Sequence, residues 1–284
     1  MNFASGTISG HLVSIFALAI GLVAAGCDGG SDNTGGAGGS DTGGAGGADT
    51  GGAGGSDTGG GGAADQPDVV EIAVRRLNQG QDVAAFEAAR DAFVAELKKQ
   101  PGVGVDREFQ AVFDFSSGGP PMPPVYIGMT QYDDLGAFQA AGAALGSSPE
   151  AGAFFSTFTP ELFTVLVPLD PAESADLASV ADQPGQVLEV GIRNLSEYSN
   201  FDAADYAEKR DAFLALLESQ DGVVREYQWV SPLDGDVAVG MTVYASQDAF
   251  MTIAQDPDFT GSPEVGAFLG AYPPAGGYVN VVVK

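Results

Sequence analysis

One sequence block occurs twice in this chain and constrains its fold more than any other feature. Residues 90–97 read RDAFVAEL, and residues 210–217 read RDAFLALL. Further blocks match around each copy in the same order, namely 71–77 with 189–195, 107–110 with 225–228, 128–138 with 240–250, and 148–154 with 262–268. Matched blocks in one order indicate an internal duplication, so the folded part contains two versions of one structural unit.

Each copy changes its hydrophobic period in the same places. Val70, Ile72 and Val74 recur at every second residue, which predicts a strand, and the spacing of Phe86, Phe93 and Leu97 then predicts a helix. Later strands are predicted at 107–115, 125–132 and 162–167, and in the second copy at 224–230, 237–244 and 278–283. The order β-α-β-β-α-β predicts a ferredoxin-like unit, with both helices on one face of a four-stranded antiparallel sheet.

A sheet covered on only one face must bury its other face against something else. In a tandem pair, the two open sheet faces are expected to pack on each other and form an intrachain, pseudo-dimeric α/β barrel of the α+β class. An amphipathic first helix is followed by Pro101-Gly102-Val103, and Tyr132 ends a strand before two acidic residues and Ala137-Phe138. This pattern resembles the dimeric α/β-barrel superfamily, most closely its antibiotic-biosynthesis-monooxygenase-like branch, over about residues 68–170 and 186–284.

The first 26 residues are predicted to be a lipoprotein signal peptide. The run 12–25 is apolar but too short to span a membrane, and it precedes Gly26-Cys27, the end of a segment that resembles a bacterial lipobox. Cys27 is therefore the predicted lipid-attachment site. The alternatives are an ordinary signal peptide or a buried free thiol.

The remaining boundaries follow from composition. Residues 27–67 form a Gly-rich tether with an eight-residue repeat, which is typical of a spacer rather than of a folded domain. The first α/β-barrel repeat is predicted at 68–170, an acidic connector at 171–185, and the second repeat at 186–284. The Pro-rich loop 116–124 is either a stiff surface loop or a strip that binds a partner or acts as a lid.

The charge of the folded part limits its partners. All 11 basic residues and 31 of the 38 acidic residues follow Asp68, which gives this part a net charge of −20. Such a surface repels phosphate backbones and anionic headgroups, so nucleic acid is not an expected partner and the membrane is expected to be contacted only through the lipid anchor.

The signal peptide predicts an extracytoplasmic location, in the periplasm or on the cell surface. Because both barrel repeats lie in one chain, the predicted state is a monomer.

The residue types that are absent restrict the chemistry. The only histidine, His11, and the only cysteine, Cys27, both lie before the folded part. Catalysis by a histidine base or a Cys–His pair is therefore excluded there, as is a zinc site built on these residues. No metal or cofactor is predicted, and the resemblance implies that haem degradation, which depends on a histidine iron ligand in that superfamily, is absent.

Strand alternation supplies the candidate site residues. If Val70, Ile72 and Val74 face the helices, then Glu71 and Arg75 face the barrel interior. The same alternation places nine ligand-pocket candidates inward, namely Glu71, Arg75, Tyr126, Thr130, Tyr132, Glu189, Arg193, Thr242 and Tyr244. The tenth candidate, Trp229, lies on a second strand of the other copy and is expected to close one end of the barrel. The competing interpretation is that Glu71–Arg75 and Glu189–Arg193 form structural ion pairs where the two sheets meet.

Two functions remain open from the sequence. The first is an extracytoplasmic, lipid-anchored protein that binds a small molecule or has no catalytic role. The second, implied by the resemblance, is a cofactor-independent monooxygenase-like enzyme in which Tyr132, Tyr244, Arg75 and Arg193 position a small aromatic substrate.

Overall fold

A computed structural model describes residues 68–173 and 175–284, which form two structural units. Unit 1 contains β1 (Val69–Leu77), α2 (Val83–Leu97), β2 (Val103–Asp114), β3 (Val125–Tyr132), α3 (Leu135–Leu145), α4 (Pro149–Phe155) and β4 (Phe158–Pro168). Unit 2 contains β5 (Val187–Asn194), the 3-10 turn η2 (Leu195–Glu197), α5 (Ala203–Glu218), β6 (Val223–Val230), β7 (Val237–Tyr244), α6 (Gln247–Gln255), α7 (Pro257–Thr260), α8 (Pro263–Ala271) and β8 (Gly276–Val282). The connector between the units contains a second 3-10 turn, η1 (Leu177–Ser179).

The helix starts are fixed by the same local chemistry in both units. Asp82 and Asp202 each accept hydrogen bonds from the first-turn backbone of the long helices α2 and α5. Ser148 and Ser262 cap α4 and α8, and each is followed by a proline at the first helical position.

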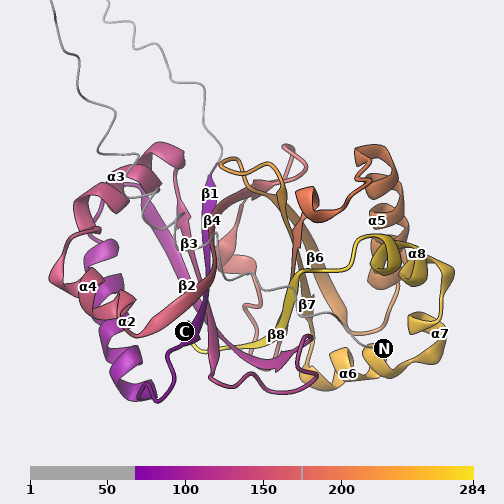
Figure 1. Ribbon diagram of the computed structural model, residues 1–284, viewed down its shortest axis with the longest axis horizontal. Coiled ribbons are helices and arrows are strands. Elements are labelled where there is room, and N and C mark those ends of the chain that lie inside the picture. The colour runs from indigo at the N-terminus through magenta and orange to yellow at the C-terminus, as the bar shows by residue number, and fades with distance from the viewer. Residues whose placement is uncertain (1–67, 174) are drawn as a thin grey trace, which may run out of the picture.

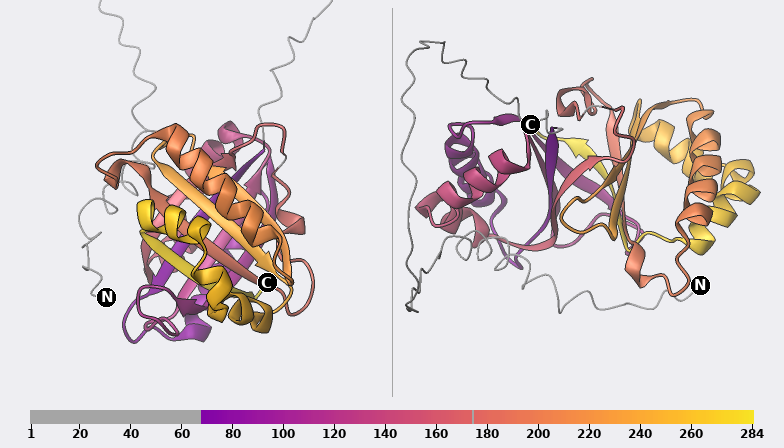
Figure 2. Two further views of the ribbon diagram at one scale, coloured as in Figure 1. Left: turned by 90° about the vertical axis from the view of Figure 1, so that its right-hand side faces the viewer. Right: turned by 90° about the horizontal axis from the view of Figure 1, so that it is seen from above.

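The eight strands close into one antiparallel barrel, in the order β1-β3-β2-β8-β5-β7-β6-β4. Each unit contributes four adjacent strands, and the units join through β2 with β8 and through β4 with β6. The helices of unit 1 cover the barrel on one side and those of unit 2 on the opposite side (Figures 1 and 2). This topology confirms the predicted α+β fold, a pseudo-dimeric α/β barrel built from one chain.

The barrel interior is the largest apolar core. Val70, Ile72 and Val74 lie there in one cluster with Leu188 and Val190 of unit 2. The predicted strand orientation was therefore inverted, because the alternate residues Glu71 and Arg75 lie on the face covered by helices. The closed interior is packed with apolar side chains from both halves of the barrel, so the more apolar face of β1 lies there.

The connector belongs to this interior core. Ala175, Leu177 and Val180 are buried in the same cluster, and the Arg107 guanidinium donates to the carbonyl oxygens of Ala178 and Ala181, at 3.4 and 2.8 Å. The segment predicted as a plain acidic connector therefore helps to fill the barrel.

The predicted lipid anchor and the helices of the folded part bear separately on membrane attachment. Cys27 and the residues of the predicted signal peptide and tether lie outside the described residues. Within 68–173 and 175–284, none of the helices combines the length and the apolar character needed to cross a membrane.

Candidate functional site

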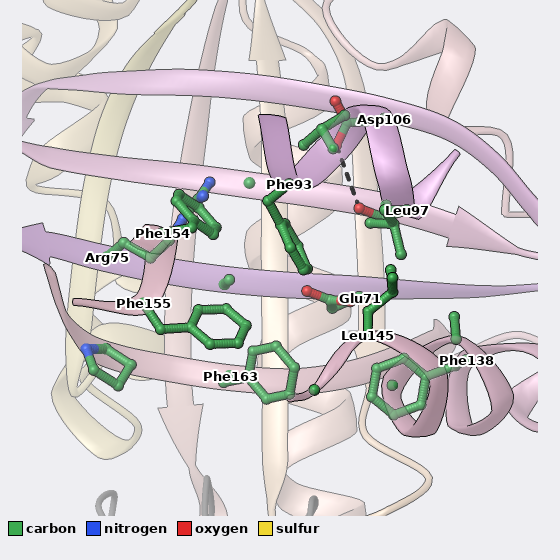
Figure 3. A pocket seen from close by; sticks show the side chains of 18 of the residues that line it. Glu71, Arg75, Phe93, Leu97, Asp106, Phe138, Leu145, Phe154, Phe155 and Phe163 are labelled. Atoms are coloured by element: carbon green, nitrogen blue, oxygen red, sulfur yellow. Dashed lines mark hydrogen bonds between the residues drawn. The ribbon is translucent and has the colours of Figure 1, made fainter. Parts of the chain in front are cut away.

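A cavity of about 400 Å³ lies in unit 1 between the outer face of the sheet and the helices α2, α3 and α4. We call it the unit 1 pocket. Figure 3 shows aromatic rings and the Glu71 carboxyl around one space. The apolar walls include Phe93, Leu97, Phe138, Phe154, Phe155 and Phe163, and the sheet supplies the polar groups Glu71, Arg75, Asp106, Glu108 and Thr130. Apolar walls with a few polar groups are typical of a small-molecule site.

Glu71 is the central polar group of this pocket. It lies on β1 opposite Thr130 of β3, and its carboxylate accepts a hydrogen bond of 2.7 Å from the Tyr132 hydroxyl. The side chain keeps some accessible surface because it faces the cavity, yet it is removed from bulk water. This burial raises the pKa of the Glu71 carboxyl to about 7, against the opposing effects of the Tyr132 hydrogen bond and of Arg75.

Asp106 on β2 adds a second carboxyl beside the first. The Thr130 hydroxyl donates to it at 3.4 Å. Burial raises the pKa of the Asp106 carboxyl, opposed by the charges of Lys98, Arg75 and Lys284, and Asp106 in turn raises the pKa of Glu71. Two carboxyls with raised pKa values therefore share one face of the pocket.

Arg75 and Glu108 form the buried ion pair of the site. The guanidinium contacts the Glu108 carboxylate at 2.6 Å, and both residues are about 95% or more removed from solvent, with exposures of 4% and 3%. The ion pair expected between Glu71 and Arg75 is therefore replaced by a pair between β1 and β2. The pair also needs a glycine at position 128, because an added Cβ there would lie 2.0 Å from the Arg75 Nη2.

The corresponding face of unit 2 has a related but different polar set. Glu189 accepts a hydrogen bond of 2.6 Å from the Tyr244 hydroxyl, which repeats the Glu71–Tyr132 contact. Arg193 donates to the Tyr272 carbonyl oxygen at 3.0 Å and lies 4.5 Å from the centre of the Phe268 ring. The expected Glu189–Arg193 ion pair is thus replaced by a contact to the backbone.

The strand register explains this difference. Asp106 pairs with Thr130, and Glu226 pairs with Thr242 at the matching position of unit 2. Two residues further along, Glu108 pairs with Gly128, whereas Gln228 pairs with Gly240. The sequence alignment of 107–110 with 225–228 was therefore wrong by two residues, and the counterpart of Glu108 is the uncharged Gln228.

Glu226 keeps the acidic character of this face in unit 2. The Thr242 hydroxyl donates to its carboxylate. Burial raises the pKa of the Glu226 carboxyl to about 8, opposed by hydrogen bonds from Thr242 and Gln228 and reinforced by the charge of Glu189.

Larger side chains occupy the space under the helices of unit 2. Ala141 of α3 corresponds by position after the helix cap to Ile253 of α6, and Gln139 corresponds to Met251. Unit 2 also has the additional helix α7, whose Phe259 ring lies 6.4 Å from the Phe213 ring. Phe250, Ile253, Met251 and Phe259 pack in one cluster.

One aromatic group of unit 2 comes from the other unit. Phe163 of β4 corresponds in register to Gly277 of β8. Phe163 pairs with Ala73 of β1, and Gly277 pairs with Gly191, the residue of β5 that matches Ala73 in the repeat. The Phe115 ring covers Gly277, where an added Cβ would meet it at 2.8 Å, and lies 6.2 Å from Phe250. Phe163 and Phe138 make the equivalent contact at 6.3 Å.

The predicted candidates lie in four places. Glu71, Arg75, Thr130 and Tyr132 line the unit 1 pocket. Tyr126 packs against Phe86 under α2, with ring centres 4.7 Å apart, and is not among the pocket-lining residues. Trp229 lies in the barrel interior beside Tyr227. The remaining four, Glu189, Arg193, Thr242 and Tyr244, lie on the helix-covered face of unit 2.

Sequence reasoning missed Asp106, Glu108 and the phenylalanine walls. Asp106 and Glu108 are two residues apart on a strand and so share a face, and Asp106 pairs with the candidate Thr130. The acidic alternation along β2 was the available signal. Among residues 68–173 and 175–284, no group of three or more His, Cys, Asp or Glu side chains is arranged to hold a metal ion.

Comparisons with known proteins give likeness of fold. No protein-family model matches the chain, and no curated protein matches it significantly. An anthrone oxidase-like protein is 10% identical with a TM-score of 0.49, over 78% of this chain and 93% of its own. A variant of chlorite dismutase from Candidatus Nitrospira defluvii is 10% identical with a TM-score of 0.46, over 78% and 92%. SnoaB, a cofactor-independent oxygenase from Streptomyces nogalater, is 17% identical with a TM-score of 0.31, over 35% and 95%.

Proposed function

We propose that unit 1 binds a small molecule with an apolar body and a polar end. The observation that carries the proposal is the cavity of about 400 Å³, with phenylalanine rings from the helices and from β4 and with carboxyl groups from β1 and β2. The apolar body would lie against Phe93, Phe138 and Phe163, and the polar end would reach Glu71 and Asp106. Cavities of roughly 300–1,000 Å³ are usual for such ligands.

A pair of leucine substitutions tests this proposal. Gly142 lines the pocket, and a Cβ added there meets nothing within 4 Å, so Gly142→Leu should block the cavity without straining the helix. Ala254 of α6 is its exposed positional counterpart, so Ala254→Leu is the matched control. We expect naphthalene derivatives to quench the protein fluorescence saturably in the parent and in the control. The same quenching in Gly142→Leu would disprove the proposal.

A second function, cofactor-independent oxygenation of a small aromatic substrate, is favoured by one observation. The Glu71 carboxyl faces the cavity, and burial raises its pKa to about 7. A carboxylate of this kind can remove a proton from a bound, weakly acidic phenol, and the electron-rich anion then reacts more readily with oxygen. Tyr132 would hold Glu71 in place through its hydrogen bond of 2.7 Å.

Oxygen uptake distinguishes this enzyme from a binding protein. With a panel of electron-rich naphthols, we expect uptake that depends on Glu71 and is lost in Glu71→Gln while naphthol binding remains. Uptake that is unchanged in Glu71→Gln would remove Glu71 from the role of base. Binding without any uptake would leave the binding function alone.

We also propose that the folded part acts outside the cytoplasm, held to a membrane by a lipid on Cys27. The apolar run before Cys27 and the Gly-rich tether after it support this location. Cys27→Ser should release the protein from washed membranes and abolish incorporation of radiolabelled palmitate. Because both halves of the barrel come from one chain, light scattering should give a monomer.

A further inference from the structure

The charged groups that line the unit 1 pocket are unequally matched. Three carboxyls, those of Glu71, Asp106 and Glu108, line the cavity together with one guanidinium, that of Arg75. Arg75 is held by Glu108 at 2.6 Å. Glu71 and Asp106 therefore have no cation of their own within the cavity wall, since Lys98 and Lys284 act on Asp106 from outside it.

One buried acceptor of the site is also unused. The Glu108 Oε1 atom accepts no hydrogen bond from the described residues, although Glu108 is only 3% exposed. The Arg90 Nη1 atom, which also makes no hydrogen bond, lies 4.0 Å from it, within ion-pair range but too far for a hydrogen bond. A buried carboxylate oxygen without a hydrogen bond is costly, so Glu108 can accept one further donor.

The aromatic rings beside these carboxyls suit a positive charge as well. Phe93 of α2, Phe155 of α4 and Phe163 of β4 lie around the same space as Glu71 (Figure 3). The face of an aromatic ring carries negative charge density, and it attracts a cation more strongly when water is excluded. Carboxyl groups and aromatic rings around one space favour the same kind of ligand.

We propose that the ligand of the unit 1 pocket is an organic cation, an amine or quaternary ammonium compound with an apolar body. This inference rests on the proposed binding function and names its ligand class. The charged nitrogen lies near Glu71 and Asp106, and the apolar body contacts the phenylalanine walls. An anionic ligand is disfavoured because Arg75, the guanidinium of the cavity wall, is already paired with Glu108.

The protonation of Glu71 gives this inference a pH signature. Glu71 shares its strand with Arg75, and it faces the Tyr132 hydroxyl of β3 and the Asp106 carboxyl of β2. Glu108 of β2 also lines the pocket, and the pocket-lining residues of α2, α3, α4 and β4 carry no charge. Burial raises the pKa of Glu71 to about 7, so the carboxyl is largely protonated in slightly acidic solution. A permanently charged cation competes with that proton for the carboxylate. The affinity of the pocket for the cation should therefore rise as the pH rises through about 7.

The test uses the full chain and three probes of nearly equal shape. They are (1-naphthylmethyl)trimethylammonium, its neutral carbon analogue 1-neopentylnaphthalene, and the anionic 1-naphthylmethanesulfonate. Binding is followed by fluorescence in about 0.5 M NaCl, which screens the acidic surface but not a buried site. We expect the cation to bind about tenfold or more tightly than the neutral analogue near pH 8, and the anion to bind most weakly.

Variants separate the pocket from the acidic surface. Glu71→Gln should reduce the preference for the cation to about twofold and remove its pH dependence. Glu189→Gln, the counterpart in unit 2, should leave both unchanged. Melting curves confirm that each variant is folded.

Each outcome decides one of the two proposals. If the neutral probe binds as tightly as the cation and Gly142→Leu blocks it, the binding function stands and the inference of a cation is overturned. If the preference for the cation disappears in salt, it belongs to the surface. If it persists unchanged in Glu71→Gln, the Glu71 carboxylate does not hold the charged nitrogen. Either result overturns the inference. Both proposals fail if none of the probes binds to the parent protein, or if Gly142→Leu leaves their binding unchanged.

Discussion

The two units share one topology but use the space under their helices differently. In unit 1, small residues of α3 such as Ala141 and Gly142 border a cavity of about 400 Å³. In unit 2, Ile253 takes the position of Ala141 and Met251 that of Gln139, and α7 adds Phe259 to the same cluster. The comparison shows that two copies of one fold can build the same barrel while they line the space under their helices with side chains of different size.

The buried charges differ in the same way. Unit 1 holds Arg75 against the carboxylate Glu108, whereas the counterpart of Glu108 in unit 2 is Gln228, and Arg193 donates to a backbone carbonyl. Both units nevertheless keep the tyrosine–glutamate contact, Tyr132 with Glu71 and Tyr244 with Glu189. The conserved contact holds the sheet, and the divergent groups distinguish the two sites.

The largest expected effect separates the two arginines. Arg75→Met leaves Glu108 buried without its partner and should lower the free energy of unfolding by about 3–5 kcal/mol. Glu108→Gln together with Arg75→Met should recover much of this loss. Arg193→Met removes a hydrogen bond to a carbonyl oxygen and should cost less, about 1–3 kcal/mol. Urea unfolding of the three variants and the parent protein measures these values. Equal losses for Arg75→Met and Arg193→Met would show that the two arginines are held in equivalent ways.

Exchanging residues between α3 and α6 tests the packing difference. Ile253 is 5% exposed, and Ile253→Ala should cost about 2–4 kcal/mol because it leaves a cavity in a packed cluster. Ala141→Ile in unit 1 should change stability by less than about 1 kcal/mol while it weakens binding of the naphthalene probe, since the added atoms enter the open pocket. A loss of more than 2 kcal/mol in Ala141→Ile would show that unit 1 has no room there.

The buried carboxyls predict a smaller effect that depends on pH. Burial raises the pKa of Glu226 to about 8 and that of Glu71 to about 7, so the folded state binds more protons than the unfolded state above pH 4.5. Stability should therefore fall as the pH rises from 4.5 through these values. Glu226→Gln should recover about 2–4 kcal/mol near pH 9, and Glu71→Gln about 1–3 kcal/mol, after allowance for solvent screening.

Thermal melting across this pH range checks both substitutions. At about pH 4, where both carboxyls are protonated in either state, each variant should melt within about 2 °C of the parent protein. A parent protein whose stability increases between pH 5 and 8 would contradict the raised pKa values.

Much of the fold could be predicted from the sequence, because the duplicated blocks and the alternating periods are local signals. The orientation of β1 could not, because both of its faces are buried, and alternation alone does not tell which covering layer is the more apolar. Glu71, Arg75, Thr130 and Tyr132 do share one face of the sheet, as predicted. That face lies under the helices, whereas the prediction placed it in the barrel interior. The partner of Arg75 depended on the register of β2, which the sequence alignment misplaced by two residues.

Xenon binding in crystals measures the difference between the cavity of unit 1 and the packed cluster under the helices of unit 2. Xenon occupies apolar cavities without requiring any particular ligand chemistry. Crystals under xenon pressure should show a strong site among Phe93, Phe138 and Phe163, with no equivalent site among Phe213, Phe250 and Phe259. Xenon density in both units, or only in unit 2, would show that the larger side chains of unit 2 do not fill the space under its helices.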